Sequence, residues 1–186
     1  MSGTVRNFYL TGNTARGFVH LLDSSLQDLK NLYILKGGAK KEKSALMKRI
    51  GNDLNEQNEI WFLHSPVDHT LLEGIMVPER KWALIDESPP HHFDLSPTVD
   101  GPKIHDIDWE NIGGLPLTTD HLAEVQRLNA DMMHRYKLAN DCFAEALRVH
   151  DEWEAIYIDA MDFQAADELT AFWDQKLFQD RSLNKK

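Results

Sequence analysis

The most constraining feature of the sequence is an apolar run that leads through a glycine pair into a helical pattern. Residues 32–35 are continuously apolar, as expected of a strand that is covered on both faces. Beyond Gly37 and Gly38, apolar residues recur at helical spacing between positions 46 and 54, and a second apolar run follows at 59–64. This order of strand, loop, helix and strand predicts a βαβ unit, and therefore an α/β fold with a mostly parallel sheet and flanking helices.

The rest of the chain divides into a strand-rich part and a helical part. Five predicted strands lie at 7–11, 17–22, 32–35, 59–64 and 82–85. The first two are predicted to form a hairpin through a turn at 12–16, and residues 88–116 read as loop. Beyond residue 118 only helical patterning remains, with a break near 162–166. We therefore predict an α/β domain at 1–117, with a helical hairpin or small bundle at 118–186 packed on or beside it.

The net charge of the chain limits the classes of partner that it is expected to bind. The 186 residues carry a net charge of −10, which argues against nucleic acid as a partner because a phosphate backbone needs a basic surface. Within the first 50 residues, however, nine Lys or Arg face only three acidic residues. A local positive field in an acidic protein suits a small anion, and a solvated basic face is the alternative.

The cellular compartment of the protein is predicted from its cysteine content and hydropathy. Cys142 is the single cysteine, so an intramolecular disulfide is excluded, and its place in a helical pattern favours a small core residue over a nucleophile. The sequence has no apolar run near the roughly 20 residues that cross a bilayer and no signal-peptide pattern at its start. We expect a cytoplasmic protein without a membrane partner.

The glycine loop resembles a Walker A motif, or P-loop. The pattern G-x-x-x-x-G-K-[ST] matches at Gly37, Lys43 and Ser44 and fails at its second glycine, where Glu42 stands. In such a loop, backbone N–H groups surround the phosphates, the lysine reaches the β- and γ-phosphates, and the hydroxyl binds Mg²⁺. The loop therefore predicts a phosphate site, with a basic strand-to-helix turn as the alternative.

The residue at the failed position opposes this function in two ways. A glycine lets the backbone approach the phosphates closely, and Glu42 removes that freedom. Its carboxylate also brings negative charge toward an anionic ligand, which Lys40 and Lys41 would offset. Gly37 and Gly38 remain as the predicted source of backbone donors.

A second element has the form of a Walker B motif. The apolar run at 82–85 ends in Asp86 and Glu87. An aspartate at this place supports Mg²⁺ and the next acid polarises water, so we predict Asp86 as a metal ligand and Glu87 and Lys43 as catalytic groups.

Across nearly its whole length the sequence resembles the bacterial tandem P-loop proteins of the ATPase or nucleotide kinase type. The matching segments are 12–18, 34–38, 43–48, 72–79, 83–86, 90–91 and 150–163. The resemblance implies a P-loop NTPase-like fold in which Lys43 binds phosphate and Ser44 and Asp86 surround Mg²⁺. Members usually have a Gly-x-Gly-Lys-Ser core and a second P-loop domain after the helical segment, and the 186 residues contain neither. We therefore also expect a homodimer, or binding to another protein, through the helices.

Three functions follow from these features. The first is weak binding of MgATP with slow hydrolysis or phosphoryl transfer, using the lysines at 40, 41 and 43 around the loop. The second is a catalytically inactive relative that acts as a scaffold or a protein-interaction module. The third is a metal-dependent hydrolase built from His91, His92 and Asp94, although the sequence lacks a zinc-binding helix pattern.

Overall fold

The computed structural model describes residues 3–88, 101–113 and 118–178. The chain forms two compact units, Met1–Ala144 and Glu145–Lys186, and the boundary between them falls inside a long helix.

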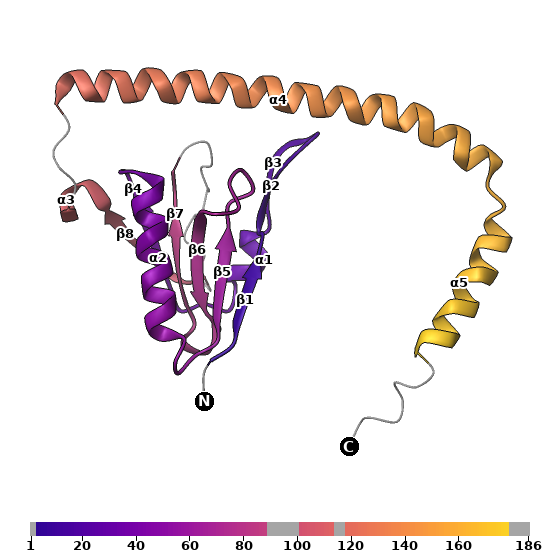
Figure 1. Cartoon of the computed structure of the whole chain (residues 1–186), viewed down its shortest axis with the longest axis horizontal. Helices are drawn as coiled ribbons and strands as arrows, with labels where there is room; N and C mark the ends of the chain where they lie inside the picture. Colours follow the sequence, from indigo (N-terminus) through magenta and orange to yellow (C-terminus); the bar gives the residue numbers. More distant parts are fainter. Residues whose placement is uncertain (1–2, 89–100, 114–117, 179–186) are drawn as a thin grey trace. The chain divides into compact units, whose positions relative to one another are not determined.

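The first unit contains a six-stranded sheet in the order β1-β5-β6-β7-β4-β8 (Figure 1). Its strands are β1 (Val5–Phe8), β4 (Asn31–Lys36), β5 (Ile60–His64), β6 (Leu72–Val77), β7 (Trp82–Asp86) and β8 (Lys103–Asp108). Strand β6 runs antiparallel to both neighbours, and the remaining pairs are parallel. The predicted α/β class with a mostly parallel sheet is therefore confirmed.

The predicted N-terminal hairpin is wrong in its strands. Strand β1 pairs with β5 in the large sheet, and the hairpin consists of β2 (Thr11–Thr14) and β3 (Gly17–His20). The segment expected as a turn contains Thr14, a β-branched residue that favours extended backbone, so the turn shrinks to two residues before Gly17. Gly17 has φ +91°, a conformation that glycine adopts without strain.

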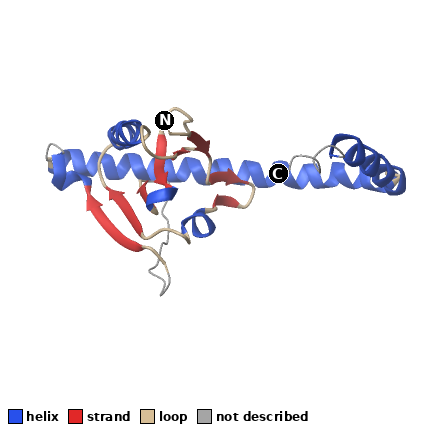
Figure 2. Cartoon of the chain, turned by 90° about the horizontal axis from the view of Figure 1, so that it is seen from below, coloured by secondary structure: helices blue, strands red, loops and turns tan. Residues whose placement is uncertain are grey.

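Helices lie against both faces of the large sheet, so the unit has three layers (Figure 2). Helix α1 (Leu22–Leu26) packs with Leu32 and Ile34 of β4 on one face. Helix α2 (Lys40–Leu54) packs through Met47 against Leu35 on the other. Alternate side chains of β4 thus enter two cores, as its continuously apolar sequence predicts.

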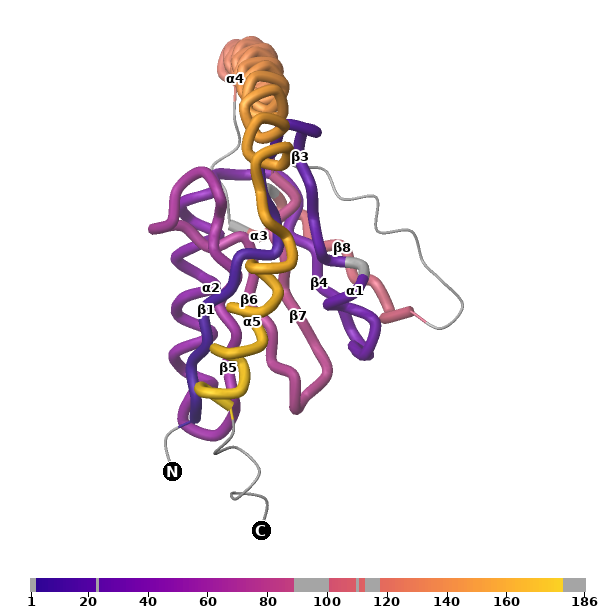
Figure 3. The backbone as a smooth tube through the Cα atoms, turned by 90° about the vertical axis from the view of Figure 1, so that its right-hand side faces the viewer, coloured from indigo at the N-terminus to yellow at the C-terminus, as the bar shows by residue number. Residues whose placement is uncertain are grey.

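The sequence did not reveal β6, β8 or the short helix α3 (Trp109–Gly113), and the prediction of a continuous loop at 88–116 is wrong for residues 103–113. Strand β6 contains the charged Glu73 and Gly74, both of which are depleted in strands. The sequence of β8 does not show a clear alternation of apolar and polar residues, because the strand lies at the edge of the sheet and its residues are only partly covered. Figure 3 shows the backbone of β4, β7 and β8 in the first unit.

Two helices form the C-terminal part: α4 (Thr119–Ala160) and α5 (Phe163–Phe178). The break that separates them lies next to the predicted one. Neither helix contains a buried residue, and Cys142, predicted to be a small core residue, is exposed. Among the described residues, no helix is long and apolar enough to span a membrane.

Candidate functional site

The candidate site lies at the carboxyl ends of the parallel strands, the edge at which open α/β sheets usually bind ligands. Strands β4 and β7 are neighbours, with Leu35 opposite Asp86 in the register. The glycine loop follows β4, and the predicted acids end β7. The two motifs therefore meet at one edge, as the sequence predicted.

The loop is shorter than the motif predicts. Helix α2 begins at Lys40, so the open segment contains only Gly37, Gly38 and Ala39. Both glycines have positive φ, +72° and +65°. The cause of the early helix start is the lack of a glycine at position 42, since Lys and Glu propagate a helix where glycine would interrupt it.

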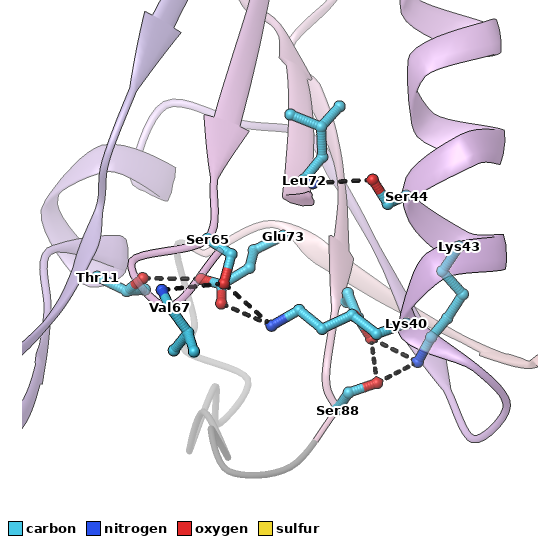
Figure 4. Close-up of polar contacts among 10 residues, drawn as sticks. Thr11, Lys40, Lys43, Ser44, Ser65, Val67, Leu72, Glu73 and Ser88 are labelled. Atoms are coloured by element: carbon cyan, nitrogen blue, oxygen red, sulfur yellow. Dashed lines mark hydrogen bonds and ion pairs between the residues drawn. The ribbon is translucent and has the colours of Figure 1, made fainter. Parts of the chain in front are cut away.

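Lys43 is the most completely buried charged residue of the site. Its side chain is 0% exposed, and its Nζ lies 2.5 Å from Asp86 Oδ1. The ammonium also donates to the hydroxyl of Ser88, which in turn donates to Asp86 Oδ1 at 2.7 Å (Figure 4). Asp86 is itself 3% exposed, and its Oδ2 has no hydrogen-bond partner among the residues that the structure describes.

Ser44 is also buried, and its hydroxyl has a structural partner. The backbone N–H of Leu72 donates to Ser44 Oγ at 2.9 Å, which ties α2 to the start of β6. A hydroxyl oxygen has two lone pairs, so one remains after this bond.

A second polar cluster lies beside Lys40, and sequence reasoning missed most of it. Lys40 Nζ lies 2.9 Å from Glu73 Oε1 and donates to Ser65 Oγ at 3.3 Å, and Thr11 donates to Glu73 Oε2 at 2.7 Å (Figure 4). The signal that could have revealed the cluster is the carboxylate of Glu73 inside an otherwise apolar run. Lys40 therefore already has an anionic partner within the fold.

Glu42 contacts the first residue of α3. Its carboxylate accepts a hydrogen bond from Trp109 Nε1 at 3.3 Å, and its side chain is exposed. The indole lies so close to Gly38 that a Cβ on that glycine would be 2.2 Å from Trp109 Cδ1. Lys41, the remaining lysine of the predicted loop, is exposed.

Glu87, the predicted catalytic acid, lies next to a lysine. Its backbone N–H donates to the carbonyl of Leu35, and its carboxylate is 3.6 Å from Lys36 Nζ. Lys36 also pairs with Asp106 at 3.1 Å. The hydrogen bond with Asp106 is the largest cause that raises the pKa of Lys36 above its usual value; burial opposes it, and the charge of Glu87 adds to the rise. The lysine therefore stays protonated beside the carboxylate.

The metal site predicted for a hydrolase rests on residues that the structure does not describe. His91, His92 and Asp94 lie outside the described residues. Within the part of the chain that the structure describes, His150, Asp151 and Glu154 on α4 are close enough to share an ion, and all three are exposed. Exposed acidic groups on one helix face are common without a metal.

Comparisons of the chain with protein-family models, curated proteins and solved structures found no match.

Proposed function

We propose that the chain binds MgATP at the carboxyl edge of the sheet, in the manner of a P-loop protein, and hydrolyses or transfers its terminal phosphoryl group slowly. The observation that carries the proposal is the fully buried pair of Lys43 and Asp86, positioned where a glycine loop enters a helix. A buried ion pair adds little to stability because desolvation cancels most of its attraction, so a role in binding accounts for it better than a role in folding.

Each residue has a specific role in this proposal. Lys43 exchanges Asp86 for phosphate oxygens when the ligand binds, while Gly37 and Gly38 let the backbone turn toward it. Lys41 adds positive charge at the helix N-terminus, where the backbone dipole also favours an anion, whereas Glu73 already offsets the charge of Lys40.

The residues present fit a magnesium ion. The free Oδ2 of Asp86 is a hard oxygen ligand, and the remaining lone pair of Ser44 Oγ is a second one. When bound, Mg²⁺ neutralises charge that develops on the phosphate oxygens. Glu87 is the group that would orient water, and its carboxylate is also paired with Lys36.

A second candidate function is a non-catalytic scaffold. It is favoured by the early start of α2 and by the bond from Leu72 to Ser44, because both occupy groups that a working P-loop keeps for its ligand. In that function the sheet is a stable platform and the exposed apolar faces of α4 and α5 bind another protein.

Calorimetric titration with MgATP separates the two candidates. The first function predicts saturable heat that disappears in a Lys43→Met, Asp86→Asn variant, which removes both charges together and leaves no buried ion. The matched control is Lys48→Met, a change to an exposed lysine of the same helix whose ammonium bonds the Thr70 carbonyl. Absence of heat in the wild-type chain at millimolar nucleotide would contradict nucleotide binding and support the scaffold.

A further inference from the structure

Helix α4 carries an apolar stripe with the period of a coiled coil. From residue 139 to residue 160 its members follow one another at a mean spacing of 3.5 residues, 21 residues in six steps, and four of them recur every seven. The stripe comprises Ala139, Cys142, Ala146, Val149, Trp153, Ile156 and Ala160. A repeat of 3.5 keeps a stripe in contact with a partner helix when the two supercoil left-handedly.

This stripe, which we call the seam, is exposed. Trp153 is 54% exposed and Ile156 is 68% exposed, and Phe143, directly beside the seam, is 49% exposed. Aromatic side chains have areas of about 150–250 Å², so Phe143, Trp153 and the adjacent Tyr157 alone present on the order of 300 Å². That already equals the largest apolar patch of a typical monomer, before the aliphatic members are added.

The stripe extends upstream of the seam, but there it has contacts within its own unit. Met132 and Tyr136 are half-buried and line a cavity with Asn13 and Val67. Burial, and then the charge of Glu73, raise the pKa of Tyr136. Ala139 lines the same cavity, so the part of the stripe outside this cavity begins at Cys142.

The charges beside the seam select an orientation for a partner helix. One flank carries carboxylates every seven residues, at Glu145, Glu152 and Asp159, and Arg148 bonds the first two and neutralises only part of their charge. The other flank carries Phe143, His150 and Tyr157 at the same spacing.

An antiparallel pair of identical helices would place the acidic flank against itself, and like charges in that position are destabilising. A parallel pair places each acidic flank against the neutral flank of the other helix, with Glu145 beside His150 of the second copy and Glu152 beside Tyr157 of the second copy. The flanks of two identical helices thus avoid contact between like charges only in the parallel orientation.

We propose that α4 pairs with α4 of a second copy of this chain in a parallel, in-register coiled coil along the seam. Cys142 then faces Cys142 of the second copy, because it lies three residues after Ala139 and four before Ala146, at a core position of the repeat. An antiparallel overlap of the same seam would place Cys142 near Tyr157 of the other helix instead. The proposal is independent of nucleotide binding.

The test uses the full chain and two matched variants. Ile156→Glu places a charge in the seam, whereas Ile158→Glu makes the same change two residues away on the opposite side of the helix, where the side chain is 50% exposed. Because both isoleucines are exposed in the single chain, neither change disturbs its core. Sedimentation equilibrium at tens of micromolar is expected to give twice the 21.4 kDa chain mass for the wild type and for Ile158→Glu. Ile156→Glu is expected to weaken association on the order of a hundredfold.

Mild oxidation tests the orientation. We expect a covalent dimer in the wild type and in Ile158→Glu, lost in Ile156→Glu at the same concentration and in Cys142→Ser. A monomeric wild type, or equal association of the two glutamate variants, would overturn the seam. A dimer that forms no disulfide through Cys142 would overturn the parallel register.

Discussion

Removing the ammonium of Lys43 without its partner is the most informative change to the stability of the first unit. In Lys43→Met the carboxylate of Asp86, 3% exposed, keeps the Ser88 hydroxyl and loses the cation 2.5 Å away. Breaking a buried ion pair on one side costs about 3–5 kcal/mol, a large share of the 5–15 kcal/mol that typically separates folded from unfolded states. Replacing both partners with apolar residues, in Lys43→Met with Asp86→Leu, is expected to cost no more than about 1 kcal/mol, since the desolvation penalty disappears with the charges.

Urea unfolding followed by tryptophan fluorescence measures both variants. We expect the single variant to have a lower urea midpoint than the wild type, with an unchanged dependence of the free energy of unfolding on urea concentration. Recovery of the midpoint in the double variant would show a strong coupling between the two side chains. A single variant that loses less than about 1 kcal/mol would refute the reasoning, because it would mean that the pair is solvated or absent. A double variant as unstable as the single one would refute it equally.

Two further predictions concern the same edge of the sheet. Gly38→Ala is expected to lower the free energy of unfolding by at least about 1–2 kcal/mol, because the φ of Gly38 is +65° and the new Cβ would lie 2.2 Å from Trp109 Cδ1. Gly12→Ala is the control and should change the free energy of unfolding little, because a Cβ at Gly12 would have no atom within 4 Å. Thermal melts compare the two variants, and equal melting temperatures would contradict the contact between Gly38 and Trp109. Lys40→Met leaves the buried carboxylate of Glu73 without its cation and is expected to lower the free energy of unfolding, measured in urea, by about 1–3 kcal/mol. Lys48→Met, a change to an exposed lysine, is the control. Equal urea midpoints for the two lysine variants would contradict the ion pair between Lys40 and Glu73.

Much of the scaffold around the site was readable from local sequence. The run 32–35 is apolar at every position because β4 lies inside the sheet with a helix on each face, and the run 82–85 is apolar because β7 lies between two other strands. The register that brings Leu35 opposite Asp86 follows from these two strands being parallel neighbours. Patterns of this kind are set by burial, so sequence periodicity reports them.

The polar contacts of the site were not readable in the same way. Glu73 pairs with Lys40 across 33 positions, and Trp109 reaches Glu42 across 67. No local pattern encodes such a pair, because it depends on how distant segments are placed by the fold. The early start of α2 is different: it follows from the helix-forming residues at 40–43, but the motif pattern, which counts identities and not propensities, gave a longer loop.

The central claim, that the carboxyl edge of the sheet receives the phosphates of MgATP, is tested most directly by hydrogen–deuterium exchange with and without the ligand. The account predicts slower exchange of backbone amides confined to residues 37–44 and to the end of β7 near Asp86, and no such slowing with ATP in the Lys43→Met, Asp86→Asn variant. Unchanged exchange in those segments at saturating MgATP, or protection elsewhere alone, would contradict it.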